Sequence, residues 1–269
     1  MSTPIRIGIV GYGNLGRGVE TALGLSPDME LVGVFTRRDP QGVDTVGAQA
    51  FPMSDLDRDR DDIDVLILCG GSRSDLPEQS PAQAARYSIV DSYDNHARIP
   101  EHFAAVDAAA KAGGTTAVIS TGWDPGLFSL NRVYGEAIVP QGSTYTFWGR
   151  GLSQGHSDAV RRVPGVAAGV QYTLPSEPAI ERVRAGENPE LSTRERHTRE
   201  CFVVLEEGAD AETVRNEIVT MPDYFEPYDT TVNFISAEVL SREHNTMPHG
   251  GFVIRSGNTT ADNAQVVEY

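Results

Sequence analysis

The first 120 residues alternate short apolar runs with segments that carry apolar residues at helical spacing. Residues 5–10 (IRIGIV), 31–35 (LVGVF) and 64–69 (DVLILC) are nearly continuous apolar runs, as is typical of strands buried on both faces. Residues 87–91 and 117–120 repeat this pattern, and residues 100–112 predict a helix between them, with Phe103 and Val106 on one face. Strands that alternate with helices predict a mostly parallel sheet with right-handed crossovers.

The pattern changes after Gly122. A helix is predicted through Ile138, and it is followed by alternating, aromatic-rich segments typical of strands at 144–148, 170–174, 201–205 and 230–235. Residues 212–221 predict a helix between the last two strands, and the polar residues 185–199 predict a mobile excursion. The fold class is therefore α/β, with a Rossmann-type domain over residues 1–122 and a mixed α+β domain with a partly exposed antiparallel sheet over residues 123–269.

A glycine-rich turn follows the first strand and opens a segment that carries Val19 and Leu23. Gly11, Gly13 and Gly16 form the pattern Gly-x-Gly-x-x-Gly. The first glycine permits a tight turn, the second lets backbone amides approach a pyrophosphate, and the third lets the helix pack close to the strand. The helix N-terminus then faces the phosphates. The alternative is a tight turn with no ligand.

The end of the second strand indicates which dinucleotide binds, because an NAD site usually offers a carboxylate to the ribose there. Thr36, Arg37 and Arg38 occupy this position, and a hydroxyl with two guanidinium groups suits a 2′-phosphate. NADP is therefore preferred over NAD. The alternative is that both arginines pair with neighbouring carboxylates such as Asp39. Cys69, Gly70, Gly71 and Ser72 end another strand, either beneath the cofactor or as a plain loop.

Two further loops carry an aspartate to the carboxyl edge of the sheet, where substrates of such folds bind. Asp94 follows one strand and Asp124 follows the next, and a carboxylate there can bind a substrate ammonium group or act as a general base. Other interpretations compete with this one. Asp124 before Pro125 is a good helix N-cap with proline at N1, and Asp94 suits an Asx turn.

Composition narrows the classes of function. The 269 residues include 38 acidic and 22 basic side chains, a net charge of −16 and 39% hydrophobic residues, which indicates a soluble globular protein. The charge disfavours nucleic acid and membrane partners, and the start of the chain lacks the pattern of a secretion signal, so a cytoplasmic location is predicted. Cys69 and Cys201 are too few for a disulfide framework, and no metal-ligand or Gly-x-Ser-x-Gly pattern occurs.

The only lysine is Lys111, at the end of a predicted helix, where it suits the helix C-terminus. A catalytic lysine is therefore disfavoured, and aspartates are left to do the acid–base work. His156, His249 and Arg199 are isolated in the sequence, and by themselves they suit surface, core or ion-pair positions.

Several longer strings carry a resemblance. They are GYGNLG at 11–16, SYDNH at 92–96, STGWDPG at 120–126, FW at 147–148, GLSQGHSD at 151–158, QYTLP at 171–175, MPDYF at 221–225 and MPHGG at 247–251. Together they span essentially the whole chain and resemble the meso-diaminopimelate D-dehydrogenase family. The resemblance implies a homodimeric enzyme that uses NADP⁺ to deaminate the D-centre of meso-2,6-diaminopimelate oxidatively, giving L-2-amino-6-oxopimelate and ammonia for lysine and cell-wall precursors.

The resemblance also implies roles for matching residues. The NADP site is implied to include Gly11, Tyr12, Gly13, Asn14, Leu15, Gly16, Thr36, Arg37, Arg38, Cys69, Gly70, Gly71, Ser72, Ser92, Tyr93, Asp94, Thr121, Gly122, Trp123, Asp124 and Pro125. Asp94, Asp124 and Trp148 are implied to surround the reacting centre, with Asp94 and Asp124 as the catalytic residues. Gln154 and Gly155 are implied to lie along the substrate, and Thr173, Arg199 and His249 to hold the distal L-amino acid end.

The family continues past the position of Tyr269 through further strand and helix, including a substrate-contacting asparagine. Residues 264–269 stop in an apolar-rich segment, so C-terminal elements are predicted to be missing from the substrate-binding and dimerisation domain, residues 123–269. Two alternatives to the implied function remain at this point. They are an NADP-dependent dehydrogenase of another D-amino or 2-oxo acid, and a non-catalytic NADP-binding sensor.

Overall fold

The structure, a computed structural model, describes residues 3–57, 62–222, 224–246, 248–261 and 263–269. The chain divides into two compact units, Met1–Ser129 (unit 1) and Leu130–Tyr269 (unit 2). Helix α4 (Leu127–Ile138) runs across the boundary between their residue ranges.

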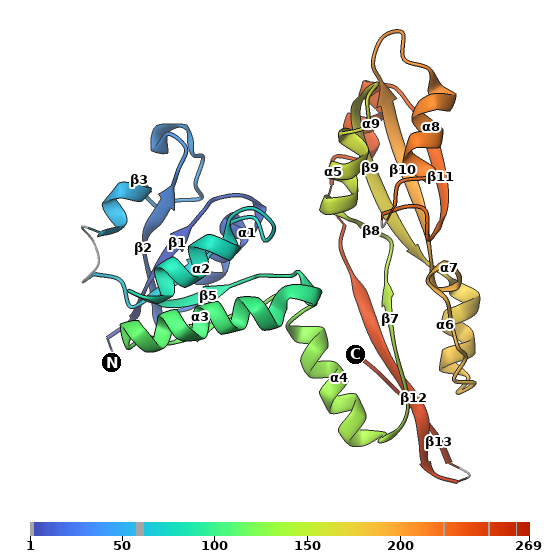
Figure 1. Ribbon diagram of the computed structural model, residues 1–269, viewed down its shortest axis with the longest axis horizontal. Coiled ribbons are helices and arrows are strands. Elements are labelled where there is room, and N and C mark those ends of the chain that lie inside the picture. Colours follow the sequence, from blue (N-terminus) through green and yellow to red (C-terminus); the bar gives the residue numbers. More distant parts are fainter. Residues whose placement is uncertain (1–2, 58–61, 223, 247, 262) are drawn as a thin grey trace. The chain divides into compact units, whose positions relative to one another are not determined.

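Unit 1 is built on a six-stranded sheet in the order β3-β2-β1-β4-β5-β6, with every neighbouring pair parallel (Figure 1). This is the strand order of a dinucleotide-binding fold. Its elements, with η for a 3₁₀ turn, are β1 (Ile5–Val10), α1 (Asn14–Leu23), β2 (Met29–Thr36), η1 (Pro40–Gly42), β3 (Ala50–Pro52), η2 (Met53–Asp57), β4 (Val65–Leu68), α2 (Leu76–Ala84), β5 (Ser88–Asp91), η4 (His96–Arg98), α3 (Ile99–Gly113) and β6 (Ala117–Val118).

Each face of this sheet has its own hydrophobic core. Ile7 and Ile9 pack with Leu23 of α1 on one face. On the other face, Leu66 and Leu68 pack with residues of α2 and α3. Because alternate residues of a strand point to opposite faces, burial on both sides explains why these strands are continuously apolar in sequence.

Strands β1, β2, β4 and β5 and helix α3 of unit 1 lie close to their predicted positions, whereas β3 was not predicted. The differences have local causes. Helix α2 escaped prediction because Pro77 stands in its first turn and Pro81 inside it, and proline disfavours a helix interior. Strand β6 is shorter than the predicted 117–120, since Ser120 adopts a positive φ of 57°. Phe103 of α3 is 57% exposed, whereas Val106 is buried.

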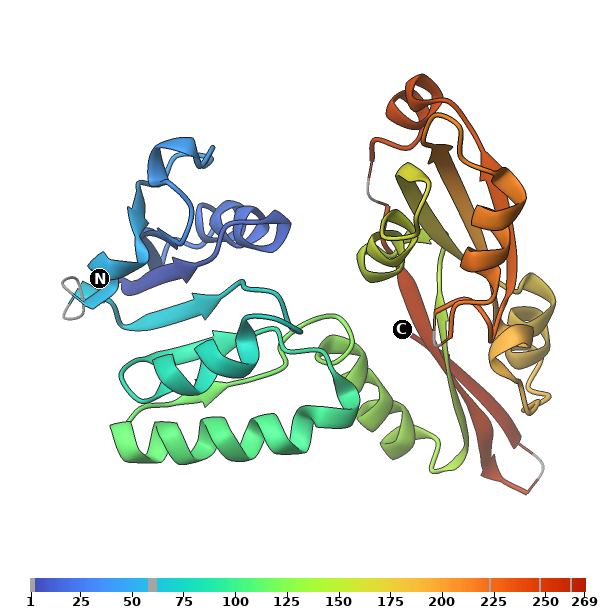
Figure 2. The same cartoon turned by 45° about the horizontal axis from the view of Figure 1, so that its top comes forward.

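Unit 2 contains two sheets, of order β11-β10-β9-β8 and β13-β12-β7 (Figure 2). Residues of α5 and α8 share a hydrophobic core with β10 and β11 of the first sheet. The elements are β7 (Gln141–Trp148), β8 (Gly151–Leu152), α5 (Gln154–Arg161), β9 (Val166–Pro175), α6 (Glu177–Arg184), α7 (Thr193–Arg196), β10 (His197–Leu205), α8 (Ala211–Val219), β11 (Asp229–Phe234), α9 (Ala237–Glu243), β12 (Gly251–Thr260) and β13 (Asn263–Glu268).

Two predictions for this region were wrong. Residues 185–199 are not a mobile excursion, because α7 begins with a capping box between Ser192 and Glu195, and β10 then starts at His197. Polar residues that alternate inward, such as His197 and Arg199, concealed the strand. The first sheet is also not wholly antiparallel, since β10 and β11 are parallel and α8 crosses between them.

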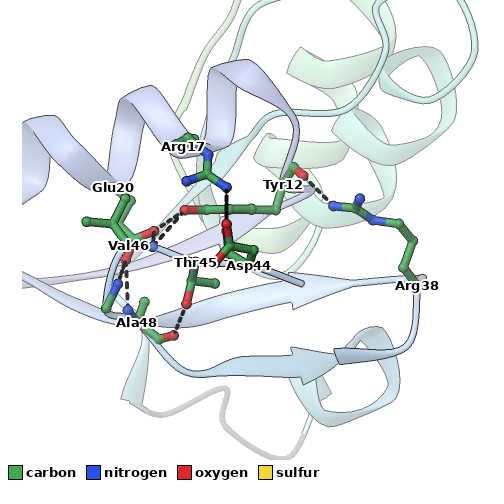
Figure 3. A network of polar contacts seen from close by, with 9 residues as sticks. Tyr12, Arg17, Glu20, Arg38, Asp44, Thr45, Val46 and Ala48 are labelled. Carbon is green, nitrogen blue, oxygen red and sulfur yellow. Dashed lines mark hydrogen bonds and ion pairs between the residues drawn. The ribbon is translucent and has the colours of Figure 1, made fainter. Parts of the chain in front are cut away.

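A buried carboxylate fastens the loop after β2 to helix α1 (Figure 3). Glu20 accepts hydrogen bonds from the backbone N–H groups of Val46, Gly47 and Ala48 at 3.0, 2.8 and 2.7 Å. The hydroxyl of Tyr12, next to the glycine turn, also donates to Glu20. One side chain therefore fixes loop 46–48 and the Tyr12 side chain together.

Replacing Glu20 with alanine is expected to lower the free energy of unfolding by about 2–4 kcal/mol, because it removes the acceptor of three backbone N–H groups and a buried hydroxyl. Urea denaturation measures this change. Glu212→Ala is the control, since Glu212 is exposed and its ion pair with Arg215 is long, at 3.4 Å, so a change within about 0.5 kcal/mol is expected. Equal stabilities of the two variants would contradict the role of Glu20.

Candidate active site

A pocket of about 270 Å³ lies in unit 1 where the loops after β1, β2 and β4 meet. This is the carboxyl edge of the sheet next to the point where the strand order reverses, and ligands of this fold bind there. The pocket is lined by Val10, Gly11, Tyr12, Gly13, Phe35, Thr36, Arg37, Arg38, Met53, Cys69, Gly70, Gly71, Asp75 and Gln79. Nine of these residues belong to the cofactor set named from the sequence.

The three glycines of the turn have the geometry that a dinucleotide needs. Gly11 has a φ of +88°, and a Cβ atom on Gly16 would lie 2.5 Å from the carbonyl oxygen of Gly11. A Cβ atom on Gly13 would meet no atom within 4 Å, so its backbone borders open space in the pocket. Helix α1 begins at Asn14 and has no acidic residue in its first turn. An anionic pyrophosphate therefore fits this end of the helix.

The arginines after β2 have specific partners. Arg37 Nη2 lies 2.8 Å from Asp75 Oδ1, while Arg38 Nη2 donates to the carbonyl oxygen of Tyr12. Asp39 instead accepts from the backbone N–H of Gln41. The proposed pairing with Asp39 was therefore wrong, although Arg37 does pair with a more distant carboxylate. The Arg37 side chain is 67% exposed, so its guanidinium remains accessible to a phosphate.

Cys69 lines the pocket with an uncharged side chain. Burial raises the pKa of its thiol to about 12, so the thiol stays protonated near neutral pH. The other residues of the predicted cofactor set do not line this pocket. They are Asn14, Leu15, Gly16, Ser72, Ser92, Tyr93, Asp94, Thr121, Gly122, Trp123, Asp124 and Pro125.

The loop that carries Asp94 is joined to the loop after β4. The backbone N–H of Asp94 donates to Ser72 Oγ at 2.9 Å, and the Asp94 side chain is exposed. Ser72 and Asp94, which were predicted on different loops of one sheet edge, are thus brought together. This contact places a carboxylate beside the glycine-rich loop Gly70–Gly71 that lines the pocket.

Asp124 lies in a closed turn before α4 and is partly buried. The N–H of Gly122 donates to the carbonyl oxygen of Pro125 at 2.9 Å, and the peptide bond between Asp124 and Pro125 is cis. Helix α4 starts at Leu127, so Asp124 is three residues ahead of the first helical residue. The N-cap interpretation of Asp124 therefore fails on position.

In unit 2 the register of the sheet aligns three predicted or neighbouring site positions. Arg199 on β10 pairs with Thr173 on β9, and Thr173 pairs with Gly151 on β8. The next residue of β8, Leu152, donates its N–H to the carbonyl oxygen of Pro248 at 2.7 Å, which ties down the segment carrying His249. The rings of Trp148 and His249 stack at 5.4 Å. Thr173 and Arg199 therefore lie side by side across β9 and β10. Trp148 and His249 are stacked on each other, and the segment that carries His249 is bonded to β8, the strand next to β9.

The two remaining predicted residues lie on α5. Gly155 is exposed, and the side chain of Gln154 is outside the described part of the structure.

Arg199 is a buried cation without a carboxylate partner among the described residues. It is 7% exposed, its Nη1 donates to Thr173 Oγ1, and its guanidinium lies 3.9 Å from the ring centre of Tyr228. Its buried Nε donates no hydrogen bond in the described structure. Burial lowers the pKa of Arg199. A buried charge of this kind is costly unless an anion pairs with it.

Two histidines near Arg199 are held neutral. Burial lowers the pKa of His156 and that of His197 to about 4, and the charge of Arg199 adds to both shifts. His197 Nε2 accepts a hydrogen bond from the backbone N–H of Trp148 at 2.9 Å. These two neighbours of Arg199 are therefore uncharged at pH 7, and neither adds a positive charge that would compete with Arg199 for an anionic ligand.

Sequence reasoning missed Asp75, Tyr228 and His197. Asp75 and Arg37 are 38 residues apart, and Arg199 and Tyr228 are brought together only by the sheet. The one available signal was the alternation of polar and apolar residues in 197–205, which indicates a strand with polar inward positions.

A glycine turn on a parallel sheet, arginines at the ribose end of the pocket and carboxylates on adjacent loops define a dehydrogenase that uses a nicotinamide dinucleotide. The model of the diaminopimelic acid dehydrogenase C-terminal domain matches residues 122–269. The meso-diaminopimelate D-dehydrogenase of Lysinibacillus sphaericus is 64% identical over 266 residues, which are 98% of this chain and 82% of that protein. The chain belongs to the diaminopimelate dehydrogenase family, whose members are oxidoreductases that act on CH–NH₂ donors.

Solved structures agree with this assignment. The Corynebacterium glutamicum enzyme in complex with DAP has a TM-score of 0.92 and 52% identity, covering 100% of this chain and 82% of that chain. An engineered D-amino acid dehydrogenase bound to NADP⁺ has a TM-score of 0.85 and 50% identity, covering 99% of this chain and 82% of that one. The Rossmann-type fold predicted from the sequence is confirmed.

None of the described helices is long and apolar enough to cross a membrane. Within the same residues, no group of three or more His, Cys, Asp or Glu side chains is placed to hold a metal ion.

The free energy of unfolding is expected to fall as the pH drops from 6.5 to 5. The unfolded chain protonates His197 near its ordinary pKa of 6.5, whereas the folded chain does so only near 4, so folding stability is full above 6.5 and is lost below it. His197→Gln keeps an acceptor for the Trp148 N–H and is expected to reduce this pH slope by about 1 kcal/mol per pH unit. Denaturant titrations at several pH values measure the slope. Identical slopes for both proteins would contradict a neutral buried His197.

Proposed function

We propose that the chain catalyses the oxidative deamination of the D-centre of meso-2,6-diaminopimelate with NADP⁺ and water. The products are L-2-amino-6-oxopimelate, ammonium, NADPH and a proton. Membership of the family supports this activity, as do the DAP and NADP⁺ named for the two solved relatives. The observation that carries the proposal is Arg199, a buried guanidinium with no carboxylate partner in the described structure and neutral neighbours. A second carboxylate distinguishes this substrate from simple D-amino acids.

We assign residues 1–122 to NADP binding and residues 123–269 to substrate binding and dimerisation. In the first part, the amides of the glycine turn hold the pyrophosphate, and Thr36, Arg37 and Arg38 hold the 2′-phosphate. Ser72, Ser92, Tyr93 and the turn 121–125 complete the cofactor site. Bound NADP⁺ supplies an acceptor for a hydride from the substrate carbon.

Asp94 and Asp124 orient the ammonium group of the reacting D-centre. Trp148 lies beside the same centre and helps to surround it. One of the two carboxylates accepts a proton from this group, directly or through water, as the hydride leaves Cα. Water then adds to the resulting imine carbon, and ammonia departs. Either aspartate can fill the role of base.

Thr173, Arg199 and His249 bind the distal L-amino acid end, with Gln154 and Gly155 along the chain of the substrate. The guanidinium pairs with the distal carboxylate, which satisfies the unpartnered Nε of Arg199. Exchanging the ammonium group and hydrogen at the distal centre leaves polar groups unpaired, so this end selects the meso isomer over the D,D isomer.

We further propose a homodimer that works in the cytoplasm. Helix α4 presents Leu130, Val133, Tyr134 and Ile138 at helical spacing, each more than half exposed. Apolar faces of this kind mark interaction surfaces, and a second copy of the chain is the occupant that the family resemblance implies. Cys69 and Cys201 are both free thiols, as suits a reducing compartment.

Arg199→Met is expected to raise the KM for meso-diaminopimelate about 100-fold while kcat changes less than about threefold, because a charge-assisted bond used in substrate binding is lost. Selectivity over simple D-amino acids should fall in parallel. Steady-state NADPH formation measures both. Arg150→Met is the control, since Arg150 is exposed and pairs with Glu200, and its KM is expected to stay within twofold. An unchanged KM and selectivity in Arg199→Met would remove Arg199 from the site.

Val133→Glu is expected to shift the protein from dimer to monomer, because it places a charge within the apolar face of α4. Light scattering coupled to gel filtration compares the mass with 29.1 kDa per chain. Leu25→Glu is the matched control, since Leu25 is an apolar residue of unit 1 that is 83% exposed and does not belong to α4, and it should leave the dimer intact. A dimer that persists in Val133→Glu, or a monomeric parent protein, would contradict this interface.

A further inference from the structure

A buried carboxylate lies behind the two aspartate loops of unit 1. Asp91 is the last residue of β5 and is 1% exposed. Its Oδ2 accepts hydrogen bonds from Ser80 Oγ of α2 at 2.6 Å and from His102 Nε2 of α3 at 2.7 Å. Ser80 is fully buried and His102 is 5% exposed. One oxygen of Asp91 is thus hydrogen-bonded to both helices that cover this face of the sheet.

The other oxygen of Asp91 is hydrogen-bonded to the two loops that carry Asp94 and Asp124. Asp91 Oδ1 accepts from the backbone N–H of Tyr93 at 3.1 Å and from that of Ser120 at 2.8 Å. Tyr93 immediately precedes Asp94, and Ser120 opens the turn that carries Asp124. The backbone carbonyl of Asp91 also accepts from the N–H and the hydroxyl of Thr121, at 2.9 and 2.6 Å. A single residue therefore bonds to both loops.

Two local features show that these bonds hold the loops in a specific conformation. Ser120 is one of two described non-glycine residues with a positive φ, 57°, a conformation that side chains rarely adopt without support from their surroundings. The ring of Tyr93 stacks on the imidazole of His102 with centroids 4.0 Å apart and 15° between the planes. The loop of Asp94 is thus tied to the cluster through both its backbone and a side chain.

We propose that Asp91 and His102 are positioning residues that fix loop 92–94 and turn 120–125 relative to each other, and thereby the placement of Asp94 and Asp124. This inference rests on the proposed function, in which these two aspartates serve the reacting centre. Asp91 does not line the cofactor pocket, whose walls come from the ends of β1, β2 and β4 with the loops that follow them, from η2 and from α2. The glycine turn and the arginines proposed to hold the phosphates of NADP⁺ line this pocket, so loss of the cluster leaves the phosphate contacts in place while it misplaces the two carboxylates. Small misplacements at a reacting centre lower turnover strongly.

A matched pair of substitutions at His102 isolates the bond to Asp91. His102→Gln retains an N–H donor that can reach Asp91 Oδ2, whereas His102→Leu removes the donor and keeps a similar bulk. Both lose the ring stacked on Tyr93, so a difference between them reports the hydrogen bond alone. The measurements are kcat and KM with meso-diaminopimelate, the Kd of NADP⁺ by fluorescence titration, and Tm.

His102→Leu is expected to lower kcat at least 10-fold with the Kd of NADP⁺ within about threefold of the parent value, and His102→Gln is expected to recover kcat to within about threefold. Equal kcat values for the two variants overturn the proposal. A loss of NADP⁺ affinity that parallels the loss of kcat also overturns it, since a merely structural role weakens both together.

Ser80→Ala keeps the inference testable if His102→Leu does not fold. It removes one bond to the same oxygen of Asp91 without adding bulk, and a fall in kcat of about threefold at unchanged NADP⁺ affinity is expected. An unchanged kcat contradicts the role of the cluster.

Asp94→Asn and Asp124→Asn separate this inference from the proposed function. If both retain full turnover, the assignment of these aspartates fails, and the inference fails with it. If they lose turnover while His102→Leu retains it, only the positioning role is wrong.

Discussion

The arrangement of unit 1 depends on the parallel direction of its six strands, which puts the carboxyl end of every strand at one edge. Loops from distant parts of the sequence meet at this edge and need fixed positions for chemistry. Three carboxylates supply the anchoring. Glu20 holds loop 46–48, Asp75 accepts from the N–H of Gly71 at 2.9 Å and pairs with Arg37, and Asp91 holds the two loops that carry the proposed catalytic aspartates. Some of the acidic side chains of the protein thus accept hydrogen bonds from backbone N–H groups and hold loops in place.

Unit 2 depends on a different constraint, the burial of a guanidinium. Arg199 is held by Thr173 and by the ring of Tyr228, and none of the described carboxylates neutralises it. Three of its neighbours are uncharged near pH 7, because burial lowers the pKa of His156 and of His197 to about 4 and raises the pKa of the Cys201 thiol to about 12. A buried cation without an anionic partner lowers the stability of the fold, and a carboxylate of a bound ligand would supply that partner.

The sequence was sufficient where burial produces a simple pattern. Strands β1, β2, β4 and β5 of unit 1 contain buried apolar residues and were predicted close to their observed positions, and the glycine turn indicated the cofactor edge. It was insufficient where a local rule is overridden by long-range contacts. Helix α2 tolerates Pro77 and Pro81, Ser120 ends β6 through a positive φ, and β10 begins within residues interpreted as a mobile loop.

The candidate site shows the same limit. The sequence indicated which residue types stand at the ends of the strands. It did not indicate that Arg37 pairs with Asp75 or what Asp91 contacts, because these contacts join residues on separate elements. The individual roles of Thr173, Arg199 and His249 came from the family resemblance, because each is isolated along the chain. Their proximity became visible only through the register of β8, β9 and β10.

The most direct test of the account is NADP⁺ reduction by the purified protein with meso-diaminopimelate and, separately, with its L,L isomer, followed by chiral analysis of the product. The account predicts that only the meso isomer yields NADPH and ammonium in equal amounts, and that the remaining amino centre is L. Equal turnover of the L,L isomer, or NADP⁺ binding without any turnover of the meso isomer, would contradict it.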